Sequence, residues 1–118
     1  TAVQTIALLH YLCGPEQGGT SFYRHRSTGF ETVTEDRFET YRDTLEAEIA
    51  AAGGAPHADY TRGDGDQFER IDRIEAKFNR AILYRGITLH SGDIPEGFAF
   101  SADPRWGRLT VNTFLVER

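Results

Sequence analysis

Cysteine and lysine are almost absent from this sequence, and methionine is missing altogether. The single cysteine, Cys13, excludes an intrachain disulfide and a cysteine-rich zinc site, which fits a reducing compartment. Lys77 is the only lysine beside twelve arginines, a bias that suits bidentate recognition of carboxylates, although the base composition of the gene is the simpler explanation. We therefore expect a cytoplasmic protein in which Cys13 is a small buried residue.

Long apolar runs and an excess of positive charge are also missing. The longest apolar run, Ile6 to Cys13, is interrupted by His10 and Tyr11 and is far shorter than the roughly 20 residues of a membrane span. Eighteen acidic residues against thirteen basic ones leave a net charge of −5 and no basic face for a phosphate backbone. The expected partner is a small-molecule or peptide substrate, with no nucleic acid and no membrane.

The length of 118 residues fits a single domain. The sequence opens without a methionine, directly into the β-like run Thr1 to Leu9. We interpret residues 1–118 as the C-terminal core of a larger domain. Strand edges exposed by such a truncation could pair two copies of the chain as a homodimer.

Short β-branched and aromatic segments alternate with glycine-rich turns along most of the chain. Apolar residues three and four apart, with acidic residues in the first turn, predict one helix over about 35–52. The fold class predicted is mainly β, a double-stranded β-helix of the jelly-roll or cupin-like kind with one lateral α-helix. Strands are expected over 1–12, 20–26, 30–33, 68–76, 78–84, 87–90 and 108–116, with the first three pairing antiparallel and a polar loop over 55–67.

Four histidines are candidates for metal binding or proton transfer. His57 and Asp59 form an H-x-D pattern, which supplies two ligands in non-haem iron sites, but this pattern is short and lies in the polar loop. His25, between two arginines, is interpreted either as solvated strand surface or as facing a substrate mouth. His10 and Cys13 would point to opposite faces of one strand, which argues against a thiol enzyme.

Three segments of the second half resemble the Fe(II)/2-oxoglutarate dioxygenases of the prolyl-hydroxylase type. These segments are FNRAILY (78–84), LHSG (89–92) and RLTVNTF (108–114). The resemblance implies that His90 is the distal iron ligand, and so the catalytic and metal-binding residue. It also implies that Arg108 binds the far carboxylate of 2-oxoglutarate, with Thr110 and Asn112 on the same face of the strand because alternate residues of a strand share a face.

The first half is similar to a hairpin of the same family. The segments LHYL (9–12) and GGTSF (18–22) carry this likeness, which implies that the hydroxyl of Tyr11 contacts 2-oxoglutarate. Cys13 stands where the family commonly has asparagine. The chain resembles small uncharacterised bacterial relatives of these oxygenases more closely still.

The H-x-D of the family precedes the Tyr11 strand, so its place here would be a few residues before Thr1. Because Fe(II) in this family needs three protein ligands, His90 alone would bind it poorly. The expected function is that of an oxygenase-like protein using Fe(II) and 2-oxoglutarate, with this chain an incomplete catalytic core. The alternative is a non-catalytic cupin-like barrel that binds a small carboxylate or a peptide. From the local sequence alone, His90 is interpreted as a core or turn histidine, and Arg108 as a residue that begins a strand and pairs with an acidic side chain.

Overall fold

The computed structural model describes residues 4–54 and 65–117, which form six strands, one α-helix and one short 3-10 helix. The elements in chain order are β1 (Thr5–Tyr11), η1 (Pro15–Gln17), β2 (Gly19–His25), α1 (Glu35–Ala51), β3 (Phe68–Ile74), β4 (Ala81–Arg85), β5 (His90–Asp93) and β6 (Thr110–Val116). The predictions of a mainly β chain and of one helix are confirmed.

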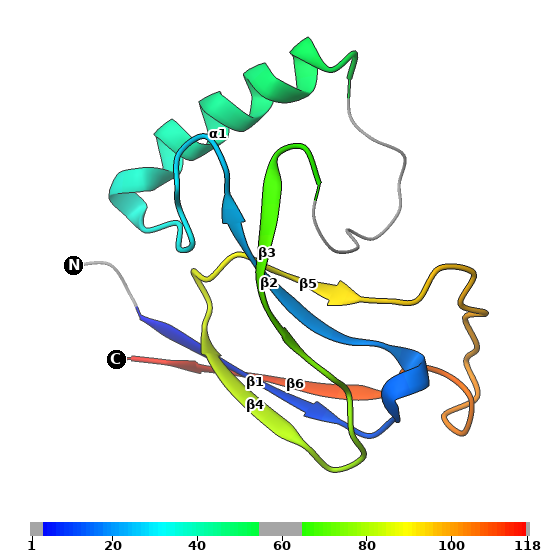
Figure 1. Ribbon diagram of the computed structural model, residues 1–118. Coiled ribbons are helices and arrows are strands. Elements are labelled where there is room, and N and C mark those ends of the chain that lie inside the picture. The colour runs from blue at the N-terminus through cyan, green and yellow to red at the C-terminus, as the bar shows by residue number, and fades with distance from the viewer. Residues whose placement is uncertain (1–3, 55–64, 118) are drawn as a thin grey trace.

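The strands form two antiparallel sheets of three strands each (Figure 1). The first sheet has the order β4-β1-β6 and the second the order β3-β2-β5. Strands that follow one another in the chain pair only once, at β2 and β3. The chain therefore crosses between the sheets repeatedly, and each central strand lies between partners distant in sequence.

A small core lies where the two sheets face each other. Ala7, Leu9 and Tyr11 alternate along β1 and are all buried, as expected of one face of a strand. Leu9 and Tyr11 pack with two further buried residues, Cys13 and Ala76. The prediction that Cys13 is buried is confirmed.

The edge strand β6 is exposed along almost its whole length. Asn112 pairs with Leu9 of β1, and Phe114 pairs with Ala7. The side chains of Asn112 and Phe114 therefore lie on the same face of the sheet as the buried residues of β1. Phe114 is nevertheless 65% exposed. Within the described residues, nothing covers this part of the first sheet.

Helix α1 crosses the end of the sandwich rather than lying flat on a sheet (Figure 1). Glu35 and Asp36 stand in its first turn, where the helix dipole favours negative charge. None of its described residues is buried. The helix therefore depends on a few specific contacts for its position, which are described below.

The predicted strands differ from the observed ones in bounds and in pairing, and the strand expected over 78–84 begins only at Ala81. Residues 30–33 form no strand and make only one bridge, between Thr32 and Thr88. The first two strands do not pair, because β1 and β2 belong to different sheets. The strand expected over 87–90 starts only at His90, and the last strand starts at Thr110, after Arg108. Where a strand begins and ends, and which strand it pairs with, depend on contacts between distant segments, which local β propensity does not reveal.

Across the described ranges, no helix combines the length and the apolar character that crossing a membrane would require.

Candidate functional site

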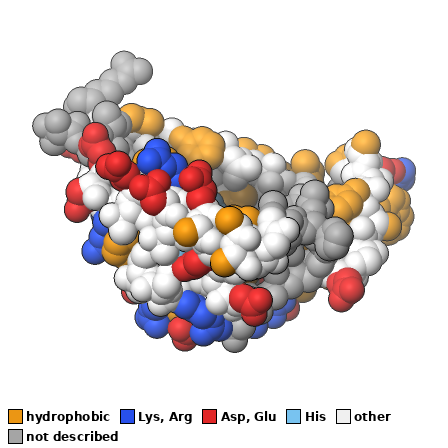
Figure 2. Space-filling view, turned by 90° about the horizontal axis from the view of Figure 1, so that it is seen from above, with side chains coloured by type: hydrophobic (Ala, Val, Ile, Leu, Met, Phe, Trp, Pro, Cys, Tyr) orange, Lys and Arg blue, Asp and Glu red, His pale blue; other side chains and the backbone are white. Residues whose placement is uncertain are grey.

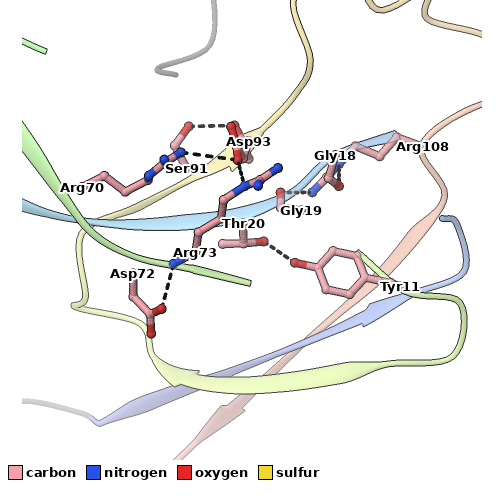
Figure 3. A network of polar contacts seen from close by, with 11 residues as sticks. Tyr11, Gly18, Gly19, Thr20, Arg70, Asp72, Arg73, Ser91, Asp93 and Arg108 are labelled. Atoms are coloured by element: carbon pink, nitrogen blue, oxygen red, sulfur yellow. Dashed lines mark hydrogen bonds and ion pairs between the residues drawn. The ribbon is translucent and has the colours of Figure 1, made fainter. Parts of the chain in front are cut away.

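Tyr11 joins the two sheets through its hydroxyl. This side chain, at the end of β1, is fully buried, and its hydroxyl shares a 2.5 Å hydrogen bond with the hydroxyl of Thr20 on β2 (Figure 3). Burial raises the pKa of Tyr11, while Thr20 and the nearby Arg108 oppose that shift. Tyr11 is therefore a neutral phenol at physiological pH.

Arg108 lies just before β6 and reaches across to the start of β2. Its Nε donates to the carbonyl of Gly18 at 3.0 Å, and its Nη2 donates to the carbonyl of Gly19 at 2.9 Å. Its guanidinium carbon stands 6.0 Å from the centre of the Tyr11 ring. Figure 3 shows the guanidinium beside the two glycines. The structure thus brings Arg108 near Tyr11, although Arg108 precedes the strand on which it was expected.

His90 opens β5, opposite Phe22 of β2. It is exposed, and its Nδ1–H donates a hydrogen bond to the carbonyl oxygen of Thr88 at 2.6 Å. Its ring centre is 4.7 Å from that of Tyr84 on β4 and 6.3 Å from that of Phe22. With Nδ1 occupied in this way, Nε2 is the nitrogen of His90 that can accept a proton or a metal.

Tyr84 of β4 contacts both Phe22 and His90 on the second sheet. Its ring packs edge-on against Phe22 at 5.4 Å and against His90. Burial raises the pKa of Tyr84, and the neighbouring Tyr11 raises it further. Tyr84 was not singled out from the sequence, because a tyrosine in a strand gives no local sign of what it faces.

Thr110 and Asn112 lie on the same face of β6 as the core residues of β1. Thr110 pairs with Tyr11 and is half-buried, whereas Asn112 pairs with Leu9 and is exposed. The expected alternation along this strand is therefore confirmed. The roles of these two residues toward a co-substrate stay predictions.

No metal cluster is formed by the residues the structure describes, since nowhere among them do three His, Cys, Asp or Glu side chains gather. His57 and Asp59 lie outside the described residues. His10 bonds through Nε2 to the side-chain oxygen of Asn79 at 2.8 Å. His90 is thus the histidine that faces the space between the sheets.

His25 has a role that the sequence did not reveal. The interpretation as solvated surface was wrong, because the side chain is fully buried at the end of β2. Its Nδ1 is 2.8 Å from the hydroxyl of Thr28, and its Nε2 donates to the carboxylate of Glu48 on α1 at 3.0 Å. Ser27 donates to the other oxygen of the same carboxylate. No local pattern could have identified this contact, because Glu48 is 23 residues away on another element.

A second polar cluster lies beside the site on the second sheet. Arg73 and Arg70 of β3 both pair with the carboxylate of Asp93 at the end of β5, the longer contact being 3.8 Å from Arg70 (Figure 3). These pairs tie β3 to β5 across β2. The contacts stabilise the second sheet.

The fold and the site together define a mainly β protein of two antiparallel sheets, with an arginine, two tyrosines and a histidine around the space between them. The chain belongs to the DUF6445 family, described as a family of unknown function, whose sequence profile matches residues 1–115. No curated protein matches the chain significantly, and no solved structure does so either.

Proposed function

We propose that this chain is the later part of a jelly roll that works as an Fe(II)/2-oxoglutarate-dependent oxygenase, in which oxygen is activated and 2-oxoglutarate is decarboxylated to succinate. The observation that carries this proposal is the order of the strands in the two sheets. The reducing compartment and the small-molecule or peptide substrate expected from the sequence belong to the same proposal.

An eight-stranded jelly roll is a long antiparallel hairpin wound into two sheets. Its strand order is 1-8-3-6 in one sheet and 2-7-4-5 in the other. Removing the first two strands leaves 8-3-6 and 7-4-5, which become β6-β1-β4 and β5-β2-β3 when the remaining strands are renumbered. These are the two orders found here. The match supports a roll that needs two more strands, one beside β6 and one beside β5.

The guanidinium of Arg108 suits a carboxylate ligand. The guanidinium carries five N–H donors and uses two of them on the carbonyls of Gly18 and Gly19, so three remain. Fixed, paired donors of this kind are what carboxylate recognition needs. The hydrogen-bonded hydroxyls of Tyr11 and Thr20 belong to the same part of the molecule, since the guanidinium carbon of Arg108 stands 6.0 Å from the centre of the Tyr11 ring. The described residues therefore offer a 2-oxo acid one anchor, the guanidinium of Arg108.

Iron does not fit the described residues alone. His90 offers one nitrogen, whereas the facial site of non-haem Fe(II) takes three protein ligands. Because β5 is an open edge that starts at His90, a strand paired with β5 would bring its own side chains next to this histidine. We attribute the other two ligands to that strand.

The test is to produce the chain together with the residues encoded before Thr1 and to measure iron-dependent formation of succinate from 2-oxoglutarate. We expect His90→Ala to abolish turnover. Unchanged succinate formation in that variant would disprove the assignment of His90.

Arg108→Ala should raise the 2-oxoglutarate concentration needed for half-maximal turnover at least tenfold, because the anchoring ion pair is lost. Arg105→Ala is the matched control, since this exposed arginine bonds only to the neighbouring Asp103. Equal effects of the two substitutions would remove the anchor role of Arg108.

The second candidate is a non-catalytic barrel that binds a small carboxylate. It is favoured by the combination of an available Arg108 with an incomplete set of iron ligands. In that case the longer chain would bind 2-oxoglutarate in calorimetry with the same affinity with and without Fe(II), and it would form no succinate.

A further inference from the structure

A groove separates helix α1 from the turn between β4 and β5. One wall is formed by Val33, Phe38 and Tyr41, and the other by Ile87 and Leu89, with His90 at the end. The groove has a volume of about 400 Å³, which lies within the usual range of small-molecule sites. We refer to it as the α1 groove. It exists because α1 buries none of its described residues against the sheets.

The α1 groove continues into a smaller cavity of about 110 Å³ beneath the helix. Tyr41, Leu89 and His90 line both spaces, and Tyr23 and Phe68 enclose the inner one. An apolar cavity of about 150 Å³ is enough to bind benzene. The inner cavity and the adjoining part of the groove thus offer room for one ring.

The lining selects the chemistry of the occupant. No Asp, Glu, Lys or Arg of the described chain lines either space, although 26% of the residues are charged. The walls are rich in aromatic rings, whose edges and faces pack well against another aromatic ring. Phe38 is 53% exposed at the rim. Figure 2 looks at the molecule from above, from the side on which α1 lies, and shows hydrophobic side chains exposed between acidic ones.

We propose that the α1 groove binds an uncharged aromatic ring of a small molecule, and that this molecule is the substrate of the oxygenase activity proposed above, on which the inference rests. An uncharged ring avoids the desolvation cost that a charged group would meet against walls with no counter-ion. His90 links the two sites, because it lines the α1 groove and also contacts Tyr84 between the sheets. A ring seated in the groove would therefore place an attached carbon next to His90.

The experiment is a titration of the isotope-labelled 118-residue chain with indole, followed by amide chemical shifts, with neither iron nor 2-oxoglutarate present. Indole should cause saturable shifts in residues 38–41 and 87–91. Benzoate has a ring and a negative charge, and should bind at least fivefold more weakly.

Phe38→Ala and Ile87→Ala, on opposite walls, should each weaken indole binding at least fivefold. Phe78→Ala is the matched control, because Phe78 is 69% exposed and lies near the opposite end of β4 from the groove. Far-ultraviolet circular dichroism checks that α1 is retained in each variant. Indole binding that neither wall variant weakens, or shifts confined to other residues, would overturn the inference, as would equal binding of benzoate.

The two proposals fail separately. If the groove binds indole but the longer chain forms no succinate, the proposed oxygenase activity is disproved and the binding site in the groove is retained. If the longer chain forms succinate and neither Phe38→Ala nor Ile87→Ala changes the KM for the substrate, the groove is not the substrate site and the oxygenase activity is retained.

Discussion

The hydroxyl pair of Tyr11 and Thr20 is the direct polar bond between the facing central strands of the two sheets. Both residues are buried, so removing one hydroxyl leaves the other without its partner in the core. We expect Tyr11→Phe to lower the free energy of unfolding by about 1–3 kcal/mol, the usual cost of an unsatisfied buried polar group. Urea denaturation measures this change.

A double-mutant cycle separates the hydrogen bond from packing. Thr20→Val replaces the second hydroxyl by a methyl group of the same shape. The loss in Tyr11→Phe/Thr20→Val should be smaller than the sum of the two single losses. Strictly additive losses would mean that the two hydroxyls do not interact.

The contact of Glu48 with His25 and Ser27 makes the position of α1 depend on pH. Hydrogen bonds from Ser27 and then His25 lower the pKa of Glu48 from its ordinary value of 4.5. A lowered pKa in the folded state gives a stabilisation that is complete above the unfolded-state pKa and is lost as the pH falls through the folded-state pKa. We expect Glu48→Gln to reduce stability by about 1 kcal/mol at pH 7, and the difference from the original protein to shrink as the pH falls below 4.5.

The free energies of unfolding at pH 7 and at pH 3 measure this effect. Glu46→Gln is the control, because Glu46 lies on the exposed side of the same helix. A difference between Glu48→Gln and the original protein that is the same at pH 7 and pH 3 would show that the carboxylate charge is not what holds α1.

At the scale of elements, the start of β2 is held unusually close to β3. A Cβ atom added to Gly19 would lie 2.0 Å from the carbonyl oxygen of Ile74, and backbone rather than a flexible side chain would have to move. We expect Gly19→Ala to destabilise the protein by about 2 kcal/mol or more, with loss of the Arg108 contact to the same glycine. Gly65→Ala, where nothing lies within 4 Å, should change stability little. Thermal denaturation compares the two variants.

The elements show where sequence reasoning succeeds and where it stops. The helix was predictable because apolar spacing and first-turn acids are local signals. The pairing of Tyr11 with the Arg108 region followed from the family resemblance and not from periodicity. The burial of His25 was not predictable, because it depends on Glu48, a residue that only the folded chain brings near. The separation of β1 and β2 into different sheets likewise depends on long-range pairing.

On the scale of the whole molecule, β6 in one sheet and β5 in the other are edge strands with no further partner strand among the described residues. β6 carries no charged residue over Thr110–Val116, and Thr113 and Leu115 are exposed on it. Uncharged exposed edges pair readily with other chains. We expect the 118-residue chain to associate with a concentration dependence that sedimentation velocity detects.

Thr113→Lys should reduce this association severalfold by placing a charge on the edge. The same substitution at Thr40, on the exposed side of α1, serves as the control. A longer chain that includes the two strands of the proposed roll should sediment as a monomer. Equal association of all these proteins would exclude β6 as the contact.

The connection between β2 and β3 begins and ends at neighbouring positions of the second sheet. His25 and Phe68 are cross-strand partners, so the chain leaves and re-enters the second sheet at adjacent positions, with α1 in between. We therefore expect replacement of residues 26–67 by a short hairpin turn to leave both strand orders intact and to remove the α1 groove, because this segment supplies one wall of the groove. The part of the chain that carries the groove is thus separate along the sequence from the strands that build most of both sheets, as binding loops are in many proteins.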